Sequence, residues 1–298
     1  MKKQTKMNPG QPVLVIILTL FTLICVLPLV LVLVVSFSSK SSLSTVGWTL
    51  FPKAWSLDGW RYVFQFSDQV VSSYKITIFE TVVGTLLNLL LNAMFGYALS
   101  RRYWALRGFL SIFLLITMLF NGGQVAGYIV NTSLYHLKNN LLILVLPGAC
   151  GAYTCIVMRT YIQGNVPESL LEAARIDGAS EIFTFFRIVL PIMVPVLAAM
   201  GFMTAVGHWN QWGTSLLYIT DAKKATLQLM LIKIEQSIDF LKNNQDHLSI
   251  AELEELKNAP DESMRMAILL VTLGPILVAY PFFQKYFSQG LTIGAVKG

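Results

Sequence analysis

The sequence predicts an all-α integral membrane protein with six transmembrane helices. Apolar residues make up 55% of the 298 residues and charged residues only 13%, whereas a soluble chain carries roughly 25% charged residues. The mean hydropathy is +0.62. Six apolar stretches are each long enough to cross a hydrocarbon core of about 30 Å, which takes about 20 helical residues.

The six predicted spans follow a short tail at residues 1–12. They cover residues 13–35, 76–99, 109–130, 141–161, 189–208 and 266–287. The first span follows three lysines, as a signal peptide would, but its apolar run exceeds the roughly 7–15 residues of a signal sequence. We therefore expect an uncleaved anchor, and a single domain over residues 13–298.

Charges in the short loops predict the orientation of the chain. The tail carries three lysines and no acidic residue, and the loop after the second span carries Arg101, Arg102 and Arg107. The loop after the third span has only Lys138. Because short cytoplasmic loops are enriched in Lys and Arg, the N-terminus is expected in the cytoplasm. Six spans then return the C-terminus to the same side.

Two long segments are expected on the outer side, at about residues 36–75 and 209–265. The second is net acidic, and Ser249-Ile250-Ala251-Glu252 within it has the form of a capping box. This pattern predicts a short surface helix that ends near Pro260.

The residue inventory excludes several function classes. A net charge of +6 is ordinary for a membrane protein with basic cytoplasmic loops, so it does not indicate nucleic-acid binding. The three histidines are far apart and none has the spacing of a metal ligand. The chain lacks the Gly-x-x-x-x-Gly-Lys-[Ser/Thr] motif of a phosphate-binding loop. If ATP drives this protein, another polypeptide must hydrolyse it, and no cofactor is expected here.

A charged segment between the fourth and fifth spans, at about residues 164–188, predicts a helix–turn–helix. Pro167-Glu168 is typical of a helix start, because proline suits the first turn and a carboxylate complements the helix dipole. Glu168, Glu172 and Arg175 are expected on one face, and Leu170, Leu171 and Ala174 on the other. Asp177-Gly178 then breaks the helix, and a second amphipathic run follows from Ile182 to Phe186.

The same segment carries a family pattern. Its members are Glu172-Ala173-Ala174, then Asp177-Gly178-Ala179, then Leu190-Pro191. This pattern closely resembles the coupling loop in membrane subunits of ATP-binding-cassette importers, where the loop docks into a groove on a separate cytoplasmic ATPase. An ordinary solvated loop would not require this combination of residues.

Further segments resemble carbohydrate importer permeases of the maltose-permease type. They are Thr85–Asn88, Tyr97–Arg101, Leu146–Ala149 and Trp209–Trp212. The C-terminal sequence from Tyr280 is similar to the subgroup that imports oligosaccharides cut from complex polysaccharides. In the third span, the sequence after Gly122-Gly123 lacks the Ile-Pro of that family, which leaves the shape of the outer gate open.

The resemblance implies the fold and the partners. The fold would be that of a type I importer permease in the bacterial plasma membrane. The partners would be a second, homologous permease subunit, a dimer of ATP-binding subunits that bind ATP and Mg²⁺, and an extracellular solute-binding protein that delivers an oligosaccharide.

Polar residues in and near the spans are candidates for a substrate path. The second span carries Glu80, Gly84, Asn88, Asn92 and Gly96, one every four residues. This stripe can serve helix–helix packing or line a path for sugar hydroxyls, and packing is the favoured interpretation. Aromatic and amide residues open the second outer segment and suit a sugar or an interfacial aromatic belt. They are Trp209, Asn210, Trp212 and Tyr218.

Two other classes are weaker hypotheses. An ion-coupled secondary transporter would require carboxylates or histidines along its path, and the spans offer little beyond Glu80. A membrane-embedded enzyme would require a nucleophile with its base, or a metal cluster. Neither alternative accounts for the pattern from Glu172 to Pro191.

Overall fold

The computed structural model describes residues 10–65, 67–243 and 262–295. These residues form helices joined by turns, and among them Ser38 and Trp55 form an isolated antiparallel bridge. The fold class predicted from composition is therefore confirmed in its all-helical character. The helix expected between Ser249 and Pro260 lies outside the described residues.

The chain divides into two compact units. The first combines residues 1–67 with 233–274, and the second combines residues 68–232 with 275–298. The helices of the first unit are α1 (Gly10–Ser36), α2 (Lys40–Val46) and α3 (Asp58–Gln65), with the C-terminal part of α13 (Leu227–Asn243) and the N-terminal part of α15 (Glu262–Ala295). Arg265 of α15 donates to Asp239 of α13 at 2.5 Å.

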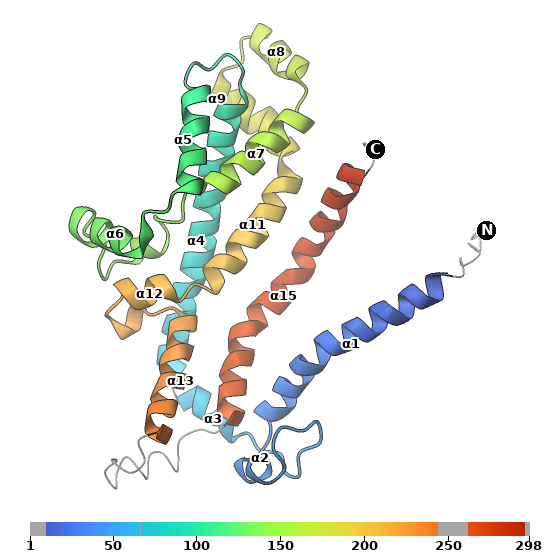
Figure 1. Cartoon of the computed structure of the whole chain (residues 1–298), viewed down its shortest axis with the longest axis vertical. Helices are drawn as coiled ribbons and strands as arrows, with labels where there is room; N and C mark the ends of the chain where they lie inside the picture. The colour runs from blue at the N-terminus through green and yellow to red at the C-terminus, as the bar shows by residue number, and fades with distance from the viewer. Residues whose placement is uncertain (1–9, 66, 244–261, 296–298) are drawn as a thin grey trace. The chain divides into compact units, whose positions relative to one another are not determined.

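The second unit holds the other helical elements of the described chain (Figure 1). They are α4 (Ser67–Ser100), α5 (Arg107–Leu119), α6 (Gly123–Ile129), η1 (Val130–Leu134), η2 (Leu141–Leu144), α7 (Ala152–Asn165), α8 (Glu168–Ile176), α9 (Glu181–Thr184), η3 (Phe185–Val189), α10 (Leu190–Ile192), α11 (Val194–Trp209), α12 (Gly213–Tyr218) and η4 (Ala222–Lys224), with the start of α13 and the end of α15. Of these, η1 and η3 are π-helical turns, and η2 and η4 are short 3₁₀ helices.

Helix α4 is the long central element of the second unit, and Figure 1 shows it running from the end that carries α8 and α9, past α12, to lie beside the start of α13. Its 34 residues span about 51 Å at about 1.5 Å per residue. Its C-terminal half packs with α7, α8, η3 and α11 in an apolar core. The buried members of that core are Ala93, Tyr97, Met158, Ile162, Val166, Leu171, Phe185, Val189, Met193, Val196 and Met200.

Three helices among the described residues are long and apolar enough to cross a membrane: Pro12–Ser36, Asp68–Ser100 and Glu262–Pro281. Two pairs of consecutive helices, each pair bent at a short break, also pass this test when the pair is counted as one span. Arg107–Leu119 joins Gly123–Leu134 at 115°, and Glu181–Ile192 joins Val194–Trp209 at 79°. The third and fifth predicted spans are therefore not single straight helices, because each chain segment bends sharply.

The expected fourth span, 141–161, is also not one helix. Its first turn is η2, residues 145–151 are irregular around Pro147-Gly148, and α7 begins only at Ala152. Side chains of α4 satisfy the irregular backbone: the Asn88 amide donates to the Gly148 carbonyl oxygen at 2.8 Å, and the side-chain oxygen Oδ1 of Asn92 accepts from the Gly151 N–H at 3.1 Å. Such a break is tolerated in a membrane protein because its backbone groups have partners.

Candidate functional site

The predicted helix–turn–helix is present at residues 168–184, as α8, a short turn and α9. Gly178 has φ +79° and follows the last helical residue and the cap Asp177. The Ala179 N–H donates to the Ala174 carbonyl oxygen at 2.9 Å and the Gly178 N–H to the Arg175 carbonyl oxygen at 3.1 Å. These two bonds are the Schellman motif, which ends a helix with a left-handed residue.

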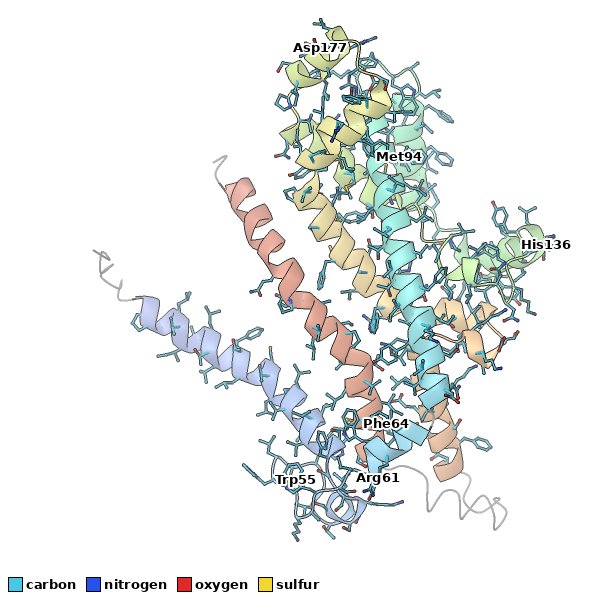
Figure 2. All side chains as sticks on the ribbon, turned by 180° about the vertical axis from the view of Figure 1, so that it is seen from behind. Trp55, Arg61, Phe64, Met94, His136 and Asp177 are labelled. Carbon is cyan, nitrogen blue, oxygen red and sulfur yellow. The ribbon has the colours of Figure 1, made fainter. Side chains whose placement is uncertain are left out.

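The second helix of the segment begins directly after this cap. Ser180 is the N-cap of α9, and its hydroxyl accepts from the Phe183 N–H at 3.2 Å. A serine in this position satisfies one of the amides that a helix start leaves unpaired. Only Asp177, Gly178, Ala179 and Ser180 therefore separate α8 from α9, and Figure 2 shows Asp177 at the tip of the second unit.

The two faces of α8 differ as expected, with one exception. Leu171 and Ala174 are buried, while Glu172 and Ala173 are exposed. Leu170, which the sequence predicts on the buried side, is 39% exposed, so the buried face of α8 is narrower than predicted. The helix–turn–helix segment thus presents Glu172, Ala173 and the turn to the outside.

Large apolar side chains are also exposed around the turn. Ile176 is 86% exposed, Ile182 is 71% exposed and Phe183 is 53% exposed. We call these three residues the turn surface. A group of exposed large apolar side chains at the tip of a rigid motif is typical of a surface that a partner protein covers.

Leu190 and Pro191 lie where the chain passes from this segment into α11. Phe185 and Val189 of the π-helical turn η3 are buried in the core, Leu190 is half-buried and Pro191 is exposed. A π turn next to a proline is a common cause of a bend, and the helix axis bends by 79° before α11. The two residues therefore belong to the joint between the segment and the membrane helix, and not to the exposed tip.

Comparison with known proteins decides the family. Residues 80–293 match the family described as "Binding-protein-dependent transport system inner membrane component". This chain belongs to that family.

Two relatives from Bacillus subtilis resemble this inner membrane component along most of its length. It is 36% identical over 281 residues to the polygalacturonan/rhamnogalacturonan transport system permease protein YtcP, covering 94% of this chain and 96% of the relative. It is 35% identical over 275 residues to protein LplC, covering 92% and 90% of the two chains.

A solved structure shares the fold. It is the crystal structure of a bacterial transporter of the ATP-binding-cassette class involved in the import of the acidic polysaccharide alginate. One of its chains matches with a TM-score of 0.79 and 26% identity, over 95% of this chain and 100% of that chain. The type I importer permease fold implied by the sequence resemblance is therefore confirmed, and the family is one of transport components.

The polar stripe of this inner membrane component makes helix-packing contacts along α4. Glu80 is fully buried with its Oε1 3.6 Å from Nδ1 of His208 on α11, and a Cβ on Gly84 would lie 2.6 Å from the His208 ring. Asn88 and Asn92 bond to residues 148–151, as described above. Each member thus faces a neighbouring segment of the same chain.

The candidate residues of the second outer segment divide between packing and exposure. Trp209 is buried, with its ring centroid 6.2 Å from that of Tyr74. Tyr218 is buried and stacks on Tyr128 at 5.3 Å. Asn210 and Trp212 are exposed. The proposed sugar contacts of these residues remain a prediction.

Replacing Asn92 with alanine separates the packing role from a path role. The change leaves the Gly151 N–H without its acceptor at 3.1 Å and is expected to lower the free energy of unfolding by about 1–2 kcal/mol. Thermal unfolding in detergent measures this loss. Asn165→Ala is the control, because the Asn165 amide bonds within its own helix, where it donates to the Tyr161 carbonyl oxygen at 2.9 Å. Normal stability of Asn92→Ala combined with lost transport would instead support a path role.

Proposed function

We propose that this chain is the membrane-spanning half of an ATP-binding-cassette importer for oligosaccharides. It would couple ATP hydrolysis by a separate cytoplasmic ATPase to alternating access of a path through the membrane. The observation that carries this proposal is the rigid helix–turn–helix segment with its exposed turn surface. The chain itself would catalyse no bond-making step, and ATP and Mg²⁺ would be bound by the partner ATPase.

The chemistry of the tip supports an ATPase as the occupant of the turn surface. Ile176, Ile182 and Phe183 supply apolar area, and Glu172 and Asp177 supply exposed carboxylates beside it. Apolar contact gives affinity, while charges at the rim select the partner. Because arginines cluster in the short loop after the second span, the positive-inside rule favours a cytoplasmic location for this end of the unit.

The substrate class is inferred from the relatives. One is named for the transport of polygalacturonan and rhamnogalacturonan, and the structural match comes from an importer of alginate. Both names refer to polysaccharides rather than to amino acids or metals. We infer that this chain imports oligosaccharides cut from such polymers, delivered by an extracellular solute-binding protein, and that a second, homologous permease subunit completes the path.

Affinity purification of the tagged chain in mild detergent, followed by mass spectrometry, tests the proposal. We expect stoichiometric recovery of a second permease and of an ATPase with a phosphate-binding loop. Uptake of labelled oligogalacturonides by cells should then stop when ATP is depleted. Recovery of the chain alone or as a homo-oligomer, with uptake insensitive to ATP depletion, would support the ion-coupled secondary transporter instead.

A further inference from the structure

A cluster of charged and aromatic side chains attaches the helix–turn–helix segment to the end of α4. Its centre is Glu181, the first residue of α9. The Tyr97 hydroxyl on α4 donates to Glu181 Oε2 at 2.5 Å, and the Tyr103 hydroxyl, in the loop after α4, donates to Oε1 at 2.6 Å. Both carboxylate oxygens are therefore held, each by a phenol from a segment about 80 residues earlier in the chain.

Two arginines complete this group, which we call the Glu181 cluster: Tyr97, Arg101, Tyr103, Arg175 and Glu181. The Arg101 side chain is only 10% exposed, with its Nε 3.8 Å from Glu181 Oε2 and 2.8 Å from the Tyr103 hydroxyl oxygen, to which it donates. The Arg175 guanidinium, on α8, lies 4.8 Å from the centre of the Tyr103 ring. Tyr103 thus contacts both helices of the segment, one on each side of the turn.

The cluster is continuous with the apolar core. Tyr97 is 7% exposed and its ring centroid lies 5.5 Å from that of Phe185 in η3. Desolvation is the largest cause that raises the pKa of the Tyr103 phenol above its ordinary value, and its hydrogen bond to Glu181 is the second. Tyr103 therefore remains protonated at neutral pH and keeps donating its hydrogen bond to the carboxylate.

The covalent connections of the segment to the membrane helices both contain breaks. Residues 166 and 167 separate α7 from α8, and the chain bends by 79° between α10 and α11. The side chains of the Glu181 cluster connect the segment to α4, and this connection does not pass through either break.

The other end of α4 is also tied to its surroundings. There the Thr77 hydroxyl accepts from the Leu227 N–H at 2.9 Å, and the Ser72 hydroxyl donates to the Lys223 carbonyl oxygen at 2.8 Å. A single continuous helix therefore connects the Glu181 cluster with the segment that follows α12. Such a helix can carry a displacement along its axis with little loss, because its backbone is internally hydrogen-bonded.

We propose that Glu181 is a positioning residue that transmits movement of the helix–turn–helix segment to α4 through the Tyr97 and Tyr103 hydroxyls. This inference rests on the proposed function, since it needs an ATPase that moves the segment. It assigns the transmission of movement to the five residues of the Glu181 cluster, of which only Arg175 and Glu181 lie within the motif from Glu172 to Pro191. Without the cluster, the ATPase would still hydrolyse ATP, but α4 would not move with the helix–turn–helix segment.

The test uses the complete complex of both permeases and the ATPase, reconstituted in liposomes with the solute-binding protein. Tyr97→Phe combined with Tyr103→Phe removes only two hydroxyl groups. We expect the number of oligogalacturonide molecules imported per ATP hydrolysed to fall about tenfold, with the ATPase still bound and still hydrolysing. Glu181→Ala should give the same phenotype.

Tyr161→Phe is the matched control, because it also removes one phenol hydroxyl, which donates to the Ile192 carbonyl oxygen at 3.3 Å. Its import per ATP should equal that of the unmodified complex. An unchanged ratio in the double variant overturns the inference, as does a proportional fall of import and hydrolysis together with lower thermal stability. Failure of the unmodified chain to recruit an ATPase would instead refute the proposed function before any variant is made.

Discussion

Replacing Gly178 with valine is expected to reduce transport at least tenfold while the chain still folds and enters the membrane. Gly178 has φ +79°, and a Cβ built there meets nothing within 4 Å. The cost therefore comes from the backbone, since a β-branched residue in the left-handed region is strained by about 1–3 kcal/mol. The Schellman motif would open, and α8 and α9 would lose the fixed angle that a docking partner needs.

The control is Gly178→Asn, because asparagine tolerates the left-handed region far better than valine. Uptake and ATPase recovery in membranes that contain equal amounts of each variant decide the outcome. We expect near-normal uptake from the asparagine variant and little from the valine variant. Equal, normal uptake by both would mean that the turn geometry is not needed for coupling.

Replacing Gly96 with leucine is expected to prevent the second unit from folding. A Cβ on Gly96 would lie 2.8 Å from the Met158 Cβ and 2.9 Å from the Arg159 backbone nitrogen. The nearest atoms include backbone, so α4 and α7 would have to separate. Overpacking a close helix contact costs about 1–3 kcal/mol even for small additions, and a leucine adds three further carbon atoms beyond the Cβ.

Gly164→Ala on α7 is the matched control, because nothing lies within 4 Å of its added Cβ and alanine has the higher helix propensity. Size-exclusion profiles of fluorescently tagged protein measure the folded fraction. We expect a monodisperse peak from Gly164→Ala and an aggregated or absent peak from Gly96→Leu. A monodisperse Gly96→Leu variant would show that α4 and α7 do not pack as closely as described.

The helix–turn–helix segment was predictable because its signals are local. Pro167 precedes the first helix and Gly178 follows it, and both act on their own backbone dihedral angles. The exposed face with Glu172 follows from helical spacing alone. The exposure of Leu170 was not predictable in this way, because it depends on which other parts of the fold cover α8 and not on spacing along the helix.

The broken spans show where hydropathy alone fails. A window over residues 141–161 averages across Pro147-Gly148, and the break there is stable because Asn88 and Asn92 of another helix bond to the freed backbone. The sequence contains both the break and the asparagines, but nothing in it indicates that they meet. The same holds for the Glu181 cluster, whose members are separated by 78 and 84 residues.

The dependence of residues 148–151 on α4 has a consequence for biosynthesis. Helix α7 has 14 residues, about 21 Å at about 1.5 Å per residue, which is shorter than a hydrocarbon core of about 30 Å. The irregular backbone that precedes it loses the Gly148 and Gly151 hydrogen bonds unless the amides of α4 are already in place. Since α4 precedes this region in the chain, it leaves the ribosome first. Translation therefore produces the α4 side chains that bond residues 148–151 before it produces those residues.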